Sequence, residues 1–294
     1  MKRILATTTI LALSAGFASS AEVTLSGDAR MGIISPFGGG DTAFTSRARV
    51  KFSMSGETDG GLTFGASFRA HNAEPASVGD SGDVYISGAF GKLSMGDVDG
   101  AAQQAVGNVD GVGLTGLGDL NETFYVHNYV NDNDDIDPTA AYEYSTGAFT
   151  GIISVSNPDA LDEVLGLGVK YATDTFSVGL GYESEDSFEN VILGGSATFG
   201  AVTLKANYSV LDTTFAGVNL SSYHVSATYT ADALAVTAFY SNEDDLFEDG
   251  GPGATGYGIG ASYDLGGGAS VVGGYASNES IDDSAFDLGL SFSF

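Results

Sequence analysis

The sequence predicts an all-β protein, and more narrowly a transmembrane antiparallel β-barrel of about sixteen strands. Three observations support this prediction. Apolar and polar residues alternate with a period of two along nearly the whole chain, which is the period of a β-strand. The polar positions are mostly Gly, Ser and Thr, so one face of each strand carries small side chains that suit contact with water. Short and long connectors take turns, as in barrels that cross an outer membrane.

The first 21 residues are predicted to be a secretory signal peptide, cleaved after Ala21. Three residues with two positive charges are followed by an apolar run from Ile4 to about Phe17, and small residues then precede the cleavage point. A transmembrane helix is the alternative, but the run is too short for it and contains Ser and Thr. The barrel domain is therefore expected to cover residues 22–294.

Charge and composition exclude several classes of protein. The chain has 10 Lys and Arg against 38 Asp and Glu, for a formal net charge of −28, which excludes nucleic acid as a partner. It has no Cys, so neither disulfides nor thiolate chemistry are available. Disorder is the usual expectation for so charged a chain, but 43% of the residues are hydrophobic and they are patterned.

The alternation places the strands in order along the chain. It is clearest over residues 23–31, 62–69, 167–171, 176–182, 202–208, 223–229, 257–263 and 286–294. Short connectors are expected at 56–61, 89–92, 145–148, 173–174, 199–201, 230–232 and 265–268. Long connectors are expected at 35–43, 72–82, 157–164, 184–190, 210–221, 242–254 and 278–284, and the longest runs roughly from 97 to 138. No segment after residue 21 has a convincing helical period of apolar residues.

A closed barrel explains this pattern better than a stacked sandwich does. In lipid no backbone group can remain unpaired, so a membrane sheet must close on itself. About sixteen strands leave a water-filled interior, whereas about eight would fill it with side chains. The apolar positions then face lipid, and Tyr residues near the strand ends on the apolar side predict two aromatic girdles.

Cations concentrate in one predicted strand, "RARVKFSMS" at 47–55. Arg47, Arg49 and Lys51 occupy alternate positions, with apolar residues between them, so the three cations share the polar face. In a barrel that face lines the lumen. Solvated cations, or bridges to neighbouring carboxylates such as Asp28, are the structural alternative.

Other motifs carry weaker signals. The acidic stretch "NDNDDID" at 131–137 suits calcium through Asp132, Asp134, Asp135 and Asp137, but it departs from the EF-hand template, and a solvated acidic loop is the alternative. Acidic outer loops that bridge to lipopolysaccharide through divalent ions are a further expectation. No other cofactor is expected. With only three His and no nucleophile signature, no enzymatic activity is expected.

Three segments carry a resemblance to a known family. The segments "AEVTLSGDARMGI", "DVYISGAFGKLSMGD" and "DLGLSFSF" resemble the general diffusion porins of Gram-negative outer membranes, the alphaproteobacterial type in particular. This resemblance implies an outer-membrane homotrimer of sixteen-stranded barrels that passes small hydrophilic solutes and ions passively. It also implies that the long third loop folds into the lumen. Asp97 stands where the family usually has a basic residue.

The resemblance further implies a charged constriction. A basic cluster on the wall would face acids on the third loop. The basic side would be Arg30, Arg47, Arg49, Lys51 and Arg69. The acidic candidates are Asp97, Asp99, Asp110, Asp119 and Glu122, without a way to tell which of them reach the constriction. Two alternative functions stay open: a substrate-selective channel of the same fold, for instance for sugars, and a secreted soluble calcium-binding β-protein.

Overall fold

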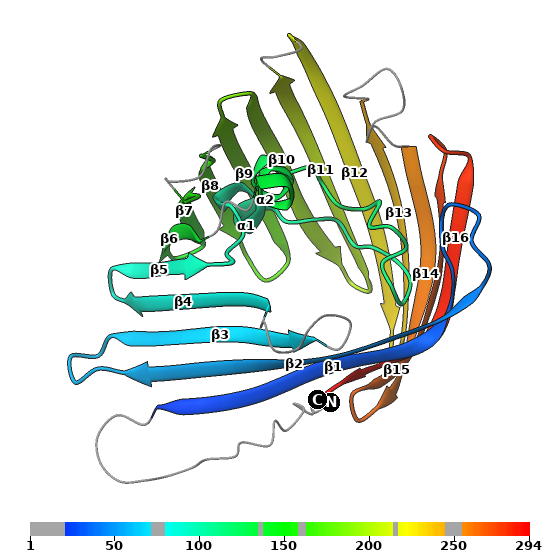
Figure 1. Ribbon diagram of the computed structural model, residues 1–294, viewed down its shortest axis with the longest axis horizontal. Coiled ribbons are helices and arrows are strands. Elements are labelled where there is room, and N and C mark those ends of the chain that lie inside the picture. The colour runs from blue at the N-terminus through cyan, green and yellow to red at the C-terminus, as the bar shows by residue number, and fades with distance from the viewer. Residues whose placement is uncertain (1–20, 72–79, 135–137, 158–162, 214–216, 245–254) are drawn as a thin grey trace.

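The protein is a closed antiparallel barrel (Figure 1). The computed structural model describes residues 21–71, 80–134, 138–157, 163–213, 217–244 and 255–294. Each strand pairs with its neighbours in sequence, and β16 pairs with β1. The sixteen-stranded closed barrel predicted from the alternation is confirmed. The predicted signal peptide, apart from Ala21, lies outside the described residues.

The elements fall in the following order. The first group is β1 (Glu22–Ser35), β2 (Ala43–Glu57), β3 (Thr63–His71), β4 (Asp80–Gly88) and β5 (Gly91–Gly96). Two helices follow, α1 (Ala101–Val106) and α2 (Val126–Asp134). The remaining strands are β6 (Thr139–Thr146), β7 (Phe149–Val155), β8 (Leu165–Ala172), β9 (Phe176–Glu185), β10 (Phe188–Phe199), β11 (Val202–Thr213), β12 (Val218–Ala231), β13 (Leu234–Glu243), β14 (Thr255–Gly266), β15 (Ala269–Asn278) and β16 (Asp283–Ser293).

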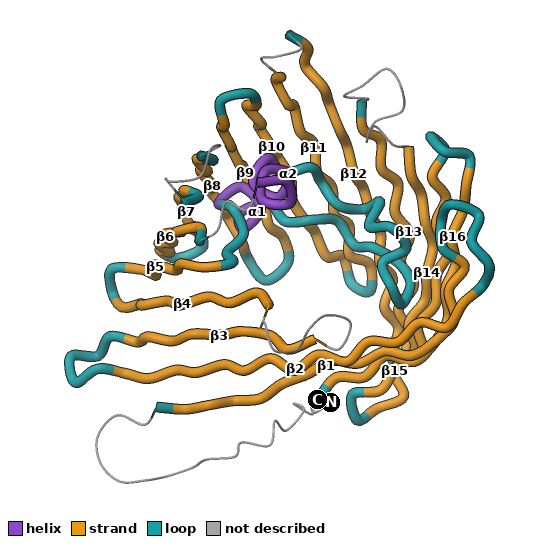
Figure 2. Tube along the Cα trace, viewed as in Figure 1, coloured by secondary structure: helices purple, strands orange, loops and turns teal. Residues whose placement is uncertain are grey.

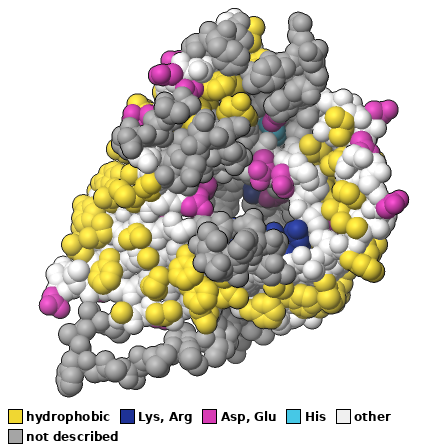
Figure 3. All heavy atoms as spheres, in the orientation of Figure 1, with side chains coloured by type: hydrophobic (Ala, Val, Ile, Leu, Met, Phe, Trp, Pro, Cys, Tyr) yellow, Lys and Arg dark blue, Asp and Glu magenta, His cyan; other side chains and the backbone are white. Residues whose placement is uncertain are grey.

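The outer face of the barrel is a band of exposed apolar side chains. Val169 is 55% exposed, Leu180 51% and Ile259 56%, while the glycines that alternate with Leu180, Gly179 and Gly181, are buried on the inner side. In the space-filling view, apolar side chains cover much of the visible outer surface (Figure 3). Lipid is the solvent that suits such a band, because in water it would be a large exposed apolar patch.

Outward-facing tyrosines form two rows on this face. Tyr171, Tyr229 and Tyr263 lie near the short turns, whereas Tyr240 and Tyr257 lie toward the opposite ends of their strands. Phe149 and Phe176 extend the first row, with ring centroids 4.7 and 5.7 Å from that of Tyr171. Amphipathic rings favour the headgroup level of a bilayer, so the two rows agree with the expected girdles.

The segment between β5 and β6 departs from the expectation that no helices follow residue 21. Both α1 and α2 belong to this segment, and neither has the long amphipathic pattern by which sequence analysis finds helices. Within the described residues, no helix has the length and apolar character needed to cross a membrane. A second departure is at 184–190, expected as a long connector, where β9 and β10 are joined directly after Glu185 by a two-residue turn, 186–187.

The buried core lies between the wall and this segment rather than between two sheets. Val126 and Val130 of α2 pack with Phe188 and Leu211 of the wall. Three further clusters also join residues of this segment to residues of the wall. Their central pairs are Val112 with Phe239, Ala101 with Ile152, and Tyr125 with Ile192. The inner face therefore carries large apolar side chains where the segment covers it.

Leu180→Arg tests the outward assignment, with Ser177→Arg on the inner face of the same strand as the control. An Arg on the lipid face near the bilayer midplane costs about 2–4 kcal/mol. We expect Leu180→Arg to lower the free energy of unfolding in lipid vesicles by that order, and Ser177→Arg to change it much less. Equal losses for the two variants would contradict the assignment.

Candidate functional site

The segment from Asp97 to Asp134, called the inner loop below, lies inside the ring of strands (Figures 1 and 2). Its first helix, α1, contacts β7, β8, β9 and β10. Beyond α1 the loop bonds to β11 and β12 through Asp110 and to β16 and β1 through Leu114. It thus runs along more than half of the inner wall. The inner faces of β2 and β3 stand apart from these contacts.

Small residues let α1 approach the wall closely. Ala101, Ala102 and Ala105 are buried against the inner faces of β8 and β9. A β-carbon at Gly181 would lie only 2.6 Å from the β-carbon of Ala102. The glycines that alternate with apolar residues in β8 and β9 therefore have a packing role, because they open a track in which a helix can lie.

Polar side chains of the wall satisfy the backbone of the inner loop. The Ser154 hydroxyl accepts a hydrogen bond from the Ala101 N–H at 2.8 Å, at the start of α1. The buried Glu183 carboxylate accepts one from the Val126 N–H at 2.8 Å, at the start of α2. The Asn190 side-chain amide donates to the Phe124 carbonyl at 3.0 Å. Buried backbone groups need such partners, so these contacts fix the position of the loop.

The five predicted cations are neighbours on the inner faces of β1, β2 and β3. In the strand register Arg30 lies opposite Arg47, Asp28 opposite Arg49, and Lys51 opposite Arg69. These five residues are called the basic cluster below: Arg30, Arg47, Arg49, Lys51 and Arg69. The alternation predicts a common face for all five, and the structure brings them together.

Asp28 organises the centre of the basic cluster. Its Oδ1 lies 2.9 Å from Arg49 Nη2 and 3.3 Å from Arg47 Nη2, and Arg49 Nε also donates to the carboxylate at 3.0 Å. The bridging expected as the structural alternative is thus present. One carboxylate serves two guanidinium groups whose side chains are still 25% and 22% exposed, so the cluster retains a positive character.

The five candidate acids of the inner loop lie in three places. Asp99, Asp119 and Glu122 lie near one another. Burial raises the pKa of Glu122, and the charges of Asp119 and Asp99 raise it further. Burial also raises the pKa of Asp99; the neighbouring His127 acts against this, and Asp97 adds to it. Asp97, at the start of the loop, donates its backbone N–H to the carbonyl of Gly82 in β4.

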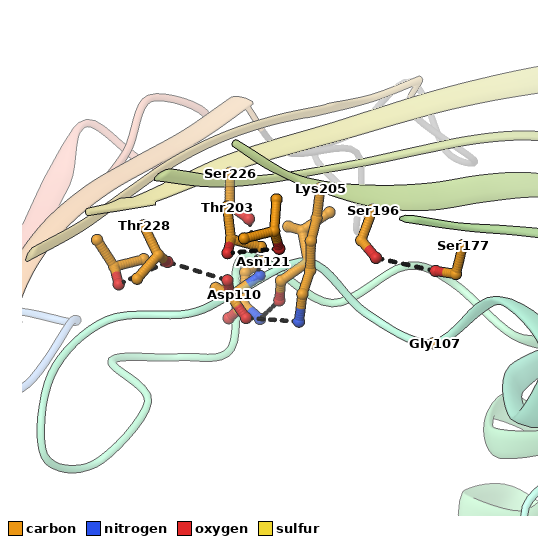
Figure 4. A network of polar contacts seen from close by, with 12 residues as sticks. Gly107, Asp110, Asn121, Ser177, Ser196, Thr203, Lys205, Ser226 and Thr228 are labelled. Atoms are coloured by element: carbon orange, nitrogen blue, oxygen red, sulfur yellow. Dashed lines mark hydrogen bonds and ion pairs between the residues drawn. The ribbon is translucent and has the colours of Figure 1, made fainter. Parts of the chain in front are cut away.

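Asp110 stands apart from these acids, on the wall formed by β11 and β12 (Figure 4). Its Oδ1 lies 2.6 Å from Lys205 Nζ, and its Oδ2 accepts a hydrogen bond from Thr228 at 3.0 Å. Its N–H donates to the Ser226 hydroxyl at 3.0 Å. Asp110 therefore pairs with a wall cation that sequence analysis did not single out, and it anchors the loop.

His224, Phe239 and the acidic stretch at 131–137 are the other residues considered for a functional role. His224 is fully buried on β12, with Nε2 3.2 Å from Glu243 Oε1. Phe239, a rare aromatic on the inner face, packs against Val112 of the inner loop and is 5% exposed. Asp132 and Asp134 fall at the end of α2, and Asp135 and Asp137 lie outside the described residues. No group of three or more potential metal ligands occurs among the residues that the structure describes.

Several residues that hold the site were missed from the sequence: Ser154, Glu183, Asn190, Lys205 and Asp287. All are polar residues on inner-face positions of strands, and that position was their only signal. Alternation assigns a residue to a face, but it does not say which other segment covers that face. The partners are hydrogen-bonded across 53 to 173 residues of sequence, as in Ser154 with Ala101 and Asp287 with Leu114.

Comparison with known proteins gives consistent matches over nearly the whole chain. The family model described as Gram-negative porin matches residues 6–283. A porin of Rhodobacter capsulatus is 39% identical, with 93% of this chain and 100% of the relative aligned. A porin of Fuscovulum blasticum is 27% identical over the same shares. A solved porin structure refined at 1.8 Å resolution superposes with a TM-score of 0.82 at 38% identity, covering 93% of this chain and 100% of that one.

Gly181→Val tests the glycine track, with Gly151→Val as the control. Gly181 faces Ala102 of α1, whereas a β-carbon at Gly151 would meet nothing within 4 Å. Overpacking of this kind costs about 1–3 kcal/mol. We expect Gly181→Val to lower the free energy of unfolding in detergent by that order and Gly151→Val to leave it nearly unchanged. An inner loop that did not lie on this track would make the two variants equivalent.

Proposed function

The chain belongs to the Gram-negative porin family, and on that premise we propose that its barrel, a channel of the outer membrane, lets small hydrophilic solutes and ions diffuse passively through a charged constriction. The observation that supports the constriction is the position of the inner loop. It is fastened along β7–β12, β16 and β1, and it leaves the four cations of the basic cluster on β2 and β3 uncovered. Solutes would pass between the loop and that cluster.

Both faces of the wall suit a water-filled channel. The outer face is apolar and exposed, so the wall fits lipid better than it fits the solution around a secreted soluble protein. The inner face beyond the loop carries hydroxyl pairs between neighbouring strands, such as Ser177 with Ser196 at 2.9 Å and Thr198 with Thr203 at 3.0 Å. Phe239 is covered by the loop, so it offers no stacking surface for a sugar.

The charges at the constriction are proposed to act on solutes rather than on folding. Two unit charges about 10 Å apart interact by only ~0.4 kcal/mol in water and ~1.7 kcal/mol at an effective dielectric of 20. Such energies contribute little to a barrel's stability. A basic cluster across from Asp99, Asp119 and Glu122 would instead maintain a transverse field, which orients dipolar solutes and slows apolar ones.

The setting of the channel follows from the same proposal. Residues 1–21 would direct export to the periplasm and be removed, as their charge and apolar pattern suggest. Family membership supports a homotrimer. Acidic residues in the outer loops would contact lipopolysaccharide phosphates through divalent cations, calcium among them.

Arg49→Gln tests the basic cluster, and Lys170→Gln on the inner face of β8 is the matched control. Each variant removes one inner-wall cation. Removing a charge from the constriction should change the local concentrations of cations and anions by about twofold each, in opposite directions, from the ~0.4 kcal/mol of such a charge at 10 Å, and their ratio by about fourfold. We expect Arg49→Gln to move the reversal potential in a salt gradient toward cation selectivity, and Lys170→Gln to move it less.

Arg47→Gln combined with Arg49→Gln should move the reversal potential further in the same direction and raise the single-channel conductance. An unchanged reversal potential in the double variant would contradict the role of the cluster. Absence of any conductance in the parent protein would contradict the channel itself.

The loop acids predict a pH dependence of selectivity. The pKa values of Asp99 and Glu122 are raised above their ordinary values of 3.8 and 4.5, chiefly by burial. As the pH falls from 7, these acids gain protons before carboxylates with ordinary pKa values do. Cation selectivity should therefore begin to fall at a higher pH than it would if Asp99 and Glu122 had ordinary pKa values. Asp99→Asn combined with Glu122→Gln should remove this early change. If the early change persists in that variant, other groups cause it.

A further inference from the structure

The tip of the inner loop, residues 113–119, turns sharply, and five of its residues have left-handed backbone angles. Gly113, Gly116 and Gly118 have positive φ angles, and so do Leu117 at 50° and Asp119 at 53°. Glycine adopts positive φ freely, but Leu117 is strained there, and such strain persists where surrounding contacts fix the conformation. Contacts from other parts of the protein must therefore hold the tip in this conformation.

Asp287, on the inner face of β16, provides polar contacts of this kind. Its Oδ1 accepts a hydrogen bond from the Leu114 N–H at 2.9 Å. Its Oδ2 accepts hydrogen bonds from the Thr115 N–H at 2.7 Å and from the Thr115 hydroxyl at 2.8 Å. Asp287 is only 3% exposed. A buried carboxylate requires such donors, and two of these are backbone groups of the tip.

The tip also contacts the other side of the seam where the barrel closes. Arg30 Nη1 on β1 donates to the Leu114 carbonyl at 3.2 Å. Gly32 of β1 and Gly289 of β16 are register partners across the seam. A β-carbon at either glycine would lie 2.8 or 2.7 Å from Leu114 Cδ2, so the Leu114 side chain occupies a notch that these two glycines leave open.

We propose that Asp287, assisted by Arg30, is a latch that holds the tip against the β1–β16 seam and so fixes the width of the aperture. This inference rests on the proposed constriction and adds the residue that positions it. Asp287 contacts the loop and not the solute, so it is a positioning residue. Without the latch the tip would leave its strained conformation, and the aperture would vary in time.

Asp287→Asn replaces one acceptor oxygen by an amide nitrogen, so one of the two backbone N–H groups, that of Leu114 or that of Thr115, loses its acceptor. In planar bilayers we expect its open-channel current to be noisier than that of the parent, with added sublevels. Ser291→Ala, on the same face of β16 and opposite Arg30 in register, is the control and should keep the quiet current. A quiet Asp287→Asn channel with the parent's conductance would overturn the latch.

A second variant separates fastening from loss of charge. The chain has no Cys, so Thr115→Cys combined with Asp287→Cys introduces a lone thiol pair at the latch. We expect the oxidised variant, with the tip fastened by a disulfide, to conduct as quietly as the parent, and the reduced variant to be as noisy as Asp287→Asn. The parent, exposed to the same reductant, should not change.

Each remaining outcome overturns the proposal. Thiols that fail to join under oxidant would contradict the contact between the tip and β16. Equal noise in the oxidised and reduced forms would show that fastening does not control the aperture. Failure of the proposed function would look different, because the parent protein would then form no channel at all.

Discussion

The constraint on which the structure depends is that a backbone in lipid has no water to bond to. Every N–H and C=O group of the spanning strands must therefore pair within the protein, and a sheet achieves this only by closing. Closure here joins β1 to β16, from Asp28 opposite Ser293 to Ser35 opposite Phe286. With no sheet edge left over, each strand needs one face for lipid and one face for the interior. The strict alternation of the sequence meets this requirement.

Closure also creates an interior that side chains of the wall alone do not fill. The inner loop uses that space. Its helix α1 lies on the glycines of β8 and β9, and its later part follows the wall through Asp110 and Lys205 to the seam. The buried apolar clusters all join loop and wall, so the loop supplies the core that the barrel lacks. Because the loop keeps to one part of the wall, the cations of β2 and β3 stand apart from it, whereas Arg30 of β1 contacts its tip.

The sequence predicted what depends on periodicity and little of what depends on contacts across the lumen. Closure, strand number and the common face of Arg30, Arg47, Arg49, Lys51 and Arg69 follow from alternation and from neighbouring strands. Asp110 illustrates the limit. Its place in the long segment makes it a candidate for the constriction together with Asp99 and Glu122, but its partner, Lys205, lies 95 residues away. Ile152 and Ile192 likewise point inward against the pattern, because α1 and Tyr125 cover them. Alternation carries no information about what covers an inner face.

The most direct test of the account is thiol accessibility along β2 in lipid vesicles. Single cysteines would replace residues 46–53 one at a time in this cysteine-free chain, and a membrane-impermeant thiol reagent would be added to channels in the bilayer. We expect thiol reactivity to alternate with a period of two, with reaction at 47, 49, 51 and 53 and protection at 46, 48, 50 and 52. Reaction at the apolar positions, or at none of the positions, would contradict a barrel whose apolar face contacts lipid and whose cations face a water-filled lumen.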